Sequence, residues 1–98
     1  MAEPLRVVAT IHCKPGTGGE AADAMRVCVR ESRKEAGCIE YAAYRTPDMP
    51  DRMTVVELWE SAAALEQHNK TPHFKALIGV VGPLAAAPIE VLVLNEIR

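Results

Sequence analysis

The sequence has no long apolar run and no block of basic residues, and both absences narrow the classes of partner. No window in the 98 residues approaches the length of a membrane-spanning helix. The 11 basic residues are scattered among 13 acidic ones, giving a net charge of −2, and binding to nucleic acid needs a concentrated positive face. We therefore expect neither a membrane nor a nucleic acid as partner.

The N-terminal residues 1–4, Met-Ala-Glu-Pro, also lack the basic start and the apolar stretch of a secretory signal. We expect a cytoplasmic protein. The three cysteines, Cys13, Cys28 and Cys38, are odd in number and far apart, so they form neither a disulfide framework nor a Cys-x-x-Cys redox or zinc pair. We interpret them as reduced residues that pack inside the fold.

The length and the apolar content predict a single domain. Hydrophobic residues make up 49% of the 98 residues, enough for one core but not for two. We find no internal repeat and no linker, and the domain is expected to span residues 1–98.

The order of the apolar runs and turn signals predicts the element order βαββαβ. The expected strands cover residues 5–13, 38–45, 53–60 and 89–97, and the expected helices cover residues 20–36, 61–68 and 71–81. The prolines and aspartates of residues 46–51 should separate the two central strands, which pair as an antiparallel hairpin. This order predicts a ferredoxin-like α+β fold, a four-stranded antiparallel sheet with its helices on one face.

Both faces of the expected sheet carry apolar side chains. The last strand contains the unbroken run Val91-Leu92-Val93-Leu94, and Val55 and Val56 point to opposite faces. Because the helices cover only one face, we expect a homodimer in which two sheets pack together. The alternative is a monomer with scattered exposed valines.

Four motifs resemble the antibiotic biosynthesis monooxygenase family of dimeric α+β barrels. They are Gly37-Cys38-x-x-Tyr41, Glu57-x-Trp59, the alanine-rich turn to His68, and Thr71-Pro72-His73-Phe74. The resemblance implies a monooxygenase that oxidises a small quinol-type aromatic substrate with O₂ in a pocket between sheet and helices. It implies that no metal or other cofactor is needed, because a deprotonated substrate can itself pass an electron to O₂.

His68 is the first candidate for the catalytic base. Its imidazole titrates near neutral pH, and a break between two helical segments lets it reach a cavity. Glu57 is the second catalytic candidate, as the carboxylate that orients the histidine. The alternatives are a surface histidine bonded to its own helix end, and for Glu57 a structural salt bridge to an arginine, in the same chain or across the dimer.

Trp59, Tyr41 and His73 are the candidate substrate-binding residues. Trp59 shares a strand face with Glu57, and Tyr41 belongs to the motif, whereas Tyr44 points to the opposite face. Core or interface packing is the alternative for Trp59, and a solvated first-turn position is the alternative for His73.

Two other functions stay open. Related domains suggest an isomerase of a small phosphorylated diketone, whose phosphate needs a cationic anchor such as Arg45, Arg52, Lys70 or Lys75. A non-catalytic dimer that binds a small molecule is the third possibility, since a fold does not fix a function. Heme is disfavoured, because heme-degrading relatives use an asparagine on the first strand where this chain has Thr10 and His12.

Overall fold

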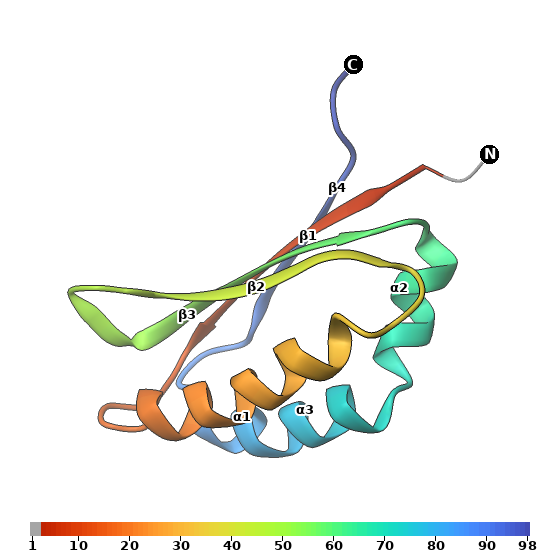
Figure 1. The fold of residues 1–98 in the computed structure, drawn as a ribbon. Coiled ribbons are helices and arrows are strands. Elements are labelled where there is room, and N and C mark those ends of the chain that lie inside the picture. The colour runs from red at the N-terminus through yellow and green to blue at the C-terminus, as the bar shows by residue number, and fades with distance from the viewer. Residues whose placement is uncertain (1–2) are drawn as a thin grey trace.

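The computed structural model describes residues 3–98 as a four-stranded sheet with helices on one side (Figure 1). Residues 1–2, part of the N-terminus inspected for a signal sequence, lie outside the described residues. The elements follow the chain in the order β1 (Leu5–His12), α1 (Gly18–Ser32), β2 (Cys38–Thr46), β3 (Met49–Trp59), α2 (Ala62–Asn69), α3 (Pro72–Leu84) and β4 (Glu90–Leu94). None of the helices within residues 3–98 is long and apolar enough to cross a membrane.

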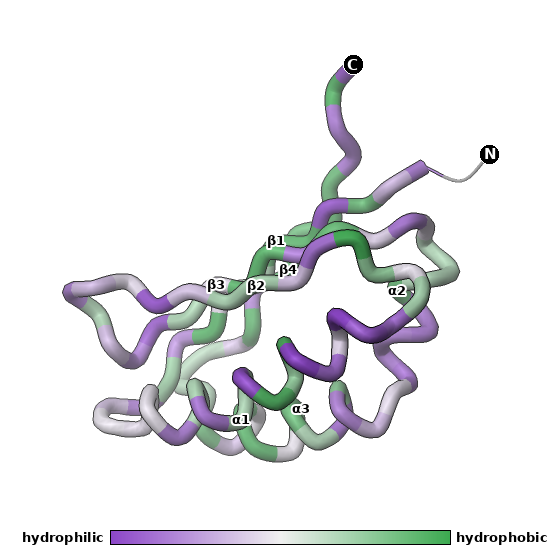
Figure 2. Tube along the Cα trace, in the orientation of Figure 1, coloured by the Kyte–Doolittle hydropathy of each residue, from purple (hydrophilic) through white to green (hydrophobic). Residues whose placement is uncertain are grey.

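The sheet has the strand order β2-β3-β1-β4, and every neighbouring pair is antiparallel. This is the ferredoxin-like arrangement predicted from the sequence. The helices lie below the sheet in Figure 1, and the tube in Figure 2 shows hydrophobic residues along the strands and along α3. The core lies between these two layers and includes Val7, Ile11, Trp59, Leu77 and Val81.

Side-chain caps place the two C-terminal helices as the sequence predicts. Ser61 accepts a hydrogen bond from the backbone N–H of Ala64 and begins α2, and Thr71 accepts one from Phe74 and begins α3. Pro72 occupies the first turn of α3, where its missing N–H costs nothing. His68 therefore lies at the end of α2, immediately before the break between the two helices.

Helix α1 ends at Ser32, four residues before the predicted end at Ala36. After it the backbone makes tighter turns, in which Lys34 N–H bonds to Glu31 and Glu35 N–H bonds to Ser32. Glu35 is therefore in a turn rather than on the helix, which lets its side chain point toward α2 and α3.

The hairpin and the last strand also differ from the prediction. Strand β3 begins at Met49, so the turn contains only Pro47 and Asp48, and Pro50 lies within the strand. A register shift between Arg45 and Thr46 accommodates this start. Strand β4 covers five residues and ends at Leu94, three residues before the predicted end.

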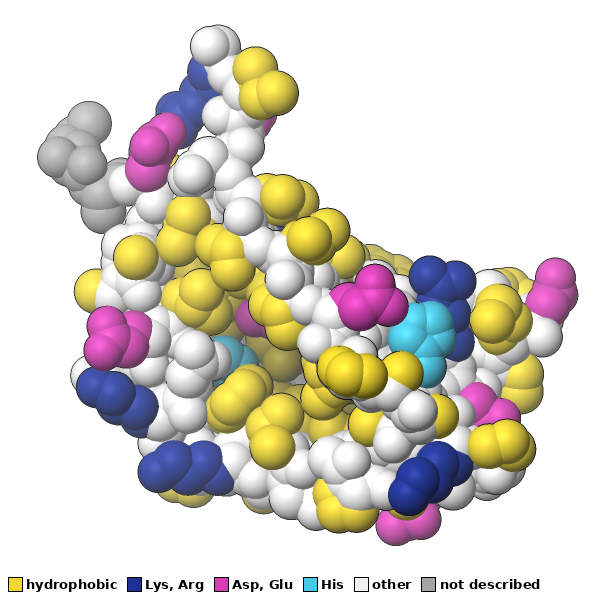
Figure 3. Space-filling view, turned by 180° about the vertical axis from the view of Figure 1, so that it is seen from behind, with side chains coloured by type: hydrophobic (Ala, Val, Ile, Leu, Met, Phe, Trp, Pro, Cys, Tyr) yellow, Lys and Arg dark blue, Asp and Glu magenta, His cyan; other side chains and the backbone are white. Residues whose placement is uncertain are grey.

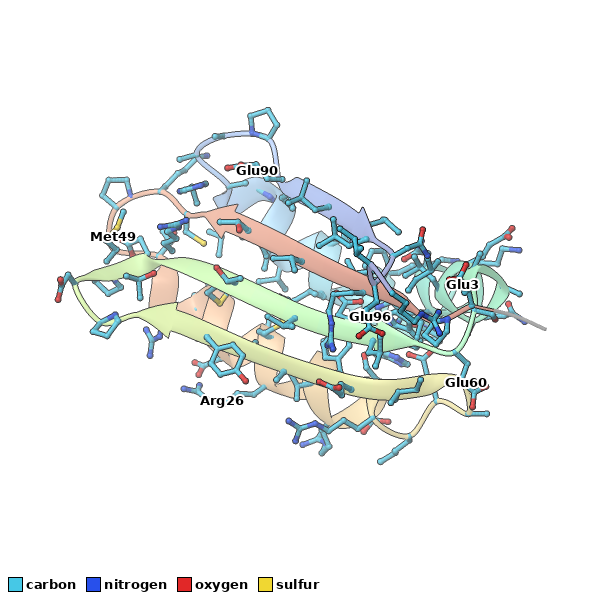
Figure 4. All side chains as sticks on the ribbon, turned by 90° about the horizontal axis from the view of Figure 1, so that it is seen from above. Glu3, Arg26, Met49, Glu60, Glu90 and Glu96 are labelled. Atoms are coloured by element: carbon cyan, nitrogen blue, oxygen red, sulfur yellow. The ribbon has the colours of Figure 1, made fainter. Side chains whose placement is uncertain are left out.

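The helices leave one face of the sheet uncovered, and Figure 4 looks onto that face. Val8 pairs with Val56 and with Leu92, and these three side chains point away from the helices. Leu92 and Leu94 are 58% and 41% exposed. The prediction of a sheet with apolar side chains on both faces is confirmed.

Candidate functional site

A cavity of about 380 Å³ lies between the sheet and the helices α2 and α3. Figure 3 looks onto this side of the molecule and shows a hollow walled mainly by hydrophobic side chains. The wall comes from β1, β3 and β4 on one side and from α2 and α3 on the other; it includes Val7, Ile11, Val55, Leu65, Phe74, Leu77, Ile89, Val91 and Val93. The cavity therefore suits an apolar or aromatic molecule.

Three buried side chains bring polar atoms to this apolar wall, namely Tyr41 from β2, Glu57 from β3 and His68 from α2; the exposed Asn69 of α2 also lines the cavity. Tyr41 and Glu57 face each other across the β2–β3 pair. All three are buried, and His68 is only 1% exposed. Each of them is a site residue predicted from the sequence, and the fold brings them together.

His68 presents one ring nitrogen to Glu35 and leaves the other without a partner. Its Nδ1 lies 2.7 Å from Glu35 Oε2. Its Nε2 is buried and makes no hydrogen bond to any of residues 3–98. A buried polar atom without a partner costs free energy, and such an atom at the wall of a cavity indicates a place for a ligand.

Aromatic rings hold the His68 side chain in place. The centroid of its ring lies 4.5 Å from that of Trp59, 5.1 Å from that of Phe74 and 5.5 Å from that of Tyr41. Burial lowers the pKa of His68, although the neighbouring Glu35 works against this effect. The imidazole is therefore held neutral, which is the form that can accept a proton.

Glu57 accepts a hydrogen bond of 2.8 Å from the indole Nε1–H of Trp59. Burial raises the pKa of Glu57 to about 7, and this hydrogen bond partly offsets the rise. No ion pair joins Glu57 to an arginine in the part of the chain that the structure describes. A salt bridge from Glu57 to an arginine of a second copy stays a prediction. With a pKa of about 7, Glu57 is partly protonated near neutral pH.

The carboxylate that contacts His68 is Glu35, not Glu57 as expected from the sequence. Glu35 was not among the predicted site residues, because the sequence predicted that it lies on a helix running to Ala36, whereas the helix ends at Ser32. His73 Nε2 also contacts Glu35 Oε2, at 2.8 Å. Neither His73 nor Trp59 lines the cavity, and the rings of both pack beside the ring of His68, which does line it.

Glu35, His68 and His73 together form the donor set that could hold a metal ion. Their nearest ligand atoms lie within 4.8 Å of one another. Imidazole nitrogens and a carboxylate oxygen suit zinc and other transition metals. Tyr41 does not belong to this set of possible metal ligands. Burial raises the pKa of its hydroxyl group, and its oxygen lies 3.5 Å from the Cys28 sulfur.

Comparisons with known proteins point to one family. The family model described as antibiotic biosynthesis monooxygenase matches residues 4–79. The chain is 36% identical to YgiN of Escherichia coli, named a probable quinol monooxygenase, over 74% of this chain and 79% of that protein. It is 30% identical to an uncharacterised Synechocystis protein over 91% of this chain, and it spans only 60% of that protein's length.

A solved structure gives the same fold over the whole chain. The crystal structure of a Pseudomonas aeruginosa protein superposes with a TM-score of 0.91 at 30% sequence identity, covering 100% of this chain and 98% of the other. The element order and the sheet topology therefore belong to a fold that other proteins share.

Proposed function

The chain belongs to the antibiotic biosynthesis monooxygenase family, and from this premise we propose that it is a monooxygenase that needs no cofactor and oxidises a small quinol-type aromatic substrate. The unpaired His68 Nε2 at the wall of an apolar cavity carries the proposal. The monooxygenase name of the Escherichia coli relative supports an oxidoreductase role.

The proposed reaction begins with removal of a proton from the substrate. A phenolic hydroxyl in the cavity would donate to His68 Nε2, and its proton would move to that nitrogen. The resulting anion is electron-rich enough to reduce O₂ directly. In a quinol, one oxygen atom of O₂ is inserted into a ring C–H bond and the other leaves as water with two hydrogens, so the quinol supplies all four electrons and the product is a hydroxyquinone.

Glu57 is suited to be the proton donor in the same cavity. With a pKa of about 7 its carboxyl group is partly protonated at neutral pH, and it could give a hydrogen to the reduced oxygen. The hydrogen bond from Trp59 fixes the position of this carboxyl group. Trp59 therefore has a supporting role in the proposal, and Tyr41 forms part of the wall beside Glu57.

The isomerase of a phosphorylated diketone is less well supported. A phosphate needs a cationic partner, and neither an arginine nor a lysine lines the cavity at His68 within residues 3–98. Arg45 instead lines a separate hollow between α1 and β2, together with Arg26, Arg30 and Arg33. The cationic groups and the base are therefore found at different places.

We also propose that the protein acts as a homodimer. The support is the face of the sheet that points away from α1, α2 and α3 (Figure 4), on which the paired Val8, Val56 and Leu92 lie among polar residues such as Arg6 and Thr10. Burying such a face against a second copy would remove apolar surface from water.

Oxygen uptake tests the proposed function. Chelator-treated protein is mixed with a panel of reduced quinones and anthrones, and we expect O₂ consumption above the uncatalysed rate for at least one compound. His68→Gln should lower kcat by about 10²-fold or more, as expected for loss of a general base. The control is Glu66→Gln, an exposed position of α2 whose side chain contacts Lys70.

Two results would contradict the proposal. One is the absence of stimulated O₂ uptake with every compound, while ligand binding persists, which would favour a non-catalytic binding protein. The other is product formation under nitrogen, because an isomerase needs no oxygen.

A further inference from the structure

Glu35 has no part in the proposed reaction, yet one of its oxygens contacts two imidazoles. Oε2 lies 2.7 Å from His68 Nδ1 and 2.8 Å from His73 Nε2. The Glu35 side chain is only 15% exposed, and the His68 side chain is 2% exposed. A mostly buried carboxylate in contact with two rings is a defined arrangement and not a chance surface contact.

The chemistry of a carboxylate decides where the hydrogens are. An ionised carboxylate only accepts hydrogen bonds, so each nitrogen that faces Glu35 must carry a hydrogen. A neutral imidazole has one N–H and one lone pair. With its hydrogen on Nδ1, His68 has its lone pair on Nε2, the nitrogen that has no partner among residues 3–98.

We propose that Glu35 is a positioning residue that holds His68 with its hydrogen on Nδ1 and its free lone pair toward the cavity, and that His73 fixes Glu35 for this task. The part of the inference that concerns catalysis rests on the proposed function. A His68 ring with the opposite hydrogen placement would present N–H to the cavity and could not take a proton from the substrate. Glu35 would also stabilise the imidazolium that forms after proton transfer.

His73 acts through Glu35 and not by contact with the cavity. Its ring comes from the first turn of α3, and Thr71 fixes that turn through its cap on Phe74. Its Nε2 contacts Oε2, the same oxygen that contacts His68 Nδ1. The second hydrogen bond limits the directions in which the carboxylate can turn.

A metal ion held by the same three residues is the competing arrangement. A metal would displace both hydrogens and would lie on the Nδ1 side of His68, away from the unpaired nitrogen. Two ordinary hydrogen bonds already account for both distances. The two arrangements differ in one observable, which is whether His68 Nδ1 carries a hydrogen.

Nitrogen NMR of histidine-labelled protein measures this directly and needs no substrate. In the wild type at neutral pH we expect His68 to be neutral, with the hydrogen on Nδ1. In Glu35→Gln the amide can donate as well as accept, so a population with the hydrogen on Nε2 should appear. Glu31→Gln, a surface position at the end of α1 that contacts Lys34, is the matched control and should leave the His68 signals unchanged.

A second pair of variants keeps the test valid if Glu35→Gln folds poorly. His73→Gln retains an N–H donor, so the hydrogen of His68 should stay on Nδ1. His73→Phe removes the donor, so a fraction of His68 should carry its hydrogen on Nε2. A wild-type His68 with its hydrogen on Nε2, or an unchanged placement in folded Glu35→Gln, would overturn the proposal. Binding of one equivalent of Zn²⁺ with loss of both N–H signals would overturn it as well.

Kinetics give the readout that depends on catalysis. If quinols are substrates, Glu35→Gln should lower kcat by about 10- to 100-fold, less than the loss expected at His68 itself. Its KM should stay within about twofold, because Glu35 does not line the cavity. If no quinol is oxidised, the NMR result still decides the role of Glu35, so the two failures are distinguishable.

Discussion

At the scale of single residues, burial acts on two ionisable groups of the cavity in opposite directions. It lowers the pKa of His68, whose charged form is the protonated one, and raises the pKa of Glu57 to about 7, because there the charged form is the deprotonated one. Both shifts therefore favour the neutral form of the group. At neutral pH the cavity offers a neutral imidazole as the base and a partly protonated carboxyl group as the acid.

The raised pKa of Glu57 makes folding stability depend on pH. The pKa rises from 4.5 to about 7 on folding, so the folded protein holds a proton that the unfolded chain has lost between these values. Stability should therefore fall as pH rises through this window, by up to about 3 kcal/mol. In Glu57→Gln this loss is removed, while the amide oxygen can still accept the hydrogen bond from Trp59.

Urea denaturation of both proteins checks this prediction. The variant should match the wild type near pH 4.5 and should be more stable at pH 8. Glu60→Gln, an exposed position just after β3, serves as the control and should follow the wild type. Equal stability differences at both pH values would contradict the prediction.

The residue scale also separates what the sequence could predict from what it could not. Strand alternation placed Glu57 and Trp59 on one face and Tyr41 opposite Tyr44, because the period of a strand is two residues. Glu35 could not be found this way. Its contact with His68 depends on where α1 ends, and helix ends are set by tertiary contacts as much as by local sequence.

At the scale of elements, Gly37 controls how closely β2 approaches α2. The sequence predicts that Gly37 ends helix α1, but α1 already ends at Ser32. Glycine is needed at this position because the chain packs closely against α2. A Cβ atom added to Gly37 would overlap the Cβ atom of Ala64. Ala64 belongs to α2, the helix that carries His68, so this contact sets the position of the candidate base.

Gly37→Ala should therefore destabilise the fold by about 1–3 kcal/mol, the usual cost of overpacking. Gly19→Ala is the opposite case, because a Cβ atom added there would meet no atom within 4 Å and the residue is in α1. It should stabilise the protein by about 0.4–1 kcal/mol. Thermal unfolding measures both changes, and a shift of the same sign in the two variants would refute the packing argument.

The boundaries of the elements were predictable where a side chain caps them. Ser61 and Thr71 lie before apolar runs and begin their helices as expected. The start of β3 was not predictable, since Pro50 argues against a strand and is accommodated only through a register shift. The local sequence therefore predicts a helix start where a side chain caps it, but not a strand start that depends on the register of the neighbouring strand.

At the scale of the whole molecule, the uncovered face of the sheet is the surface that the proposed dimer would bury. Leu92 is 58% exposed there, so Leu92→Lys should leave the isolated fold intact and place a charge in the interface. Removing a lysine from water costs free energy unless it is paired, and the dimer should dissociate. Sedimentation velocity measures the change in mass.

Val27→Lys is the control for this experiment. Val27 lies in α1 and is 46% exposed, so the same substitution adds the same charge on the helical side of the molecule. The control should sediment as the wild type does. Dissociation of both variants, or a wild type that is already monomeric, would contradict the proposed dimer.

The contact between Trp59 and His68 has a practical consequence. Trp59 is the only tryptophan of the chain, and its ring centroid lies 4.5 Å from that of the imidazole. A charge on an imidazole this close changes the emission of an indole. The protein thus contains its own optical probe, whose fluorescence would follow the protonation of the candidate base during a single turnover, without any added label.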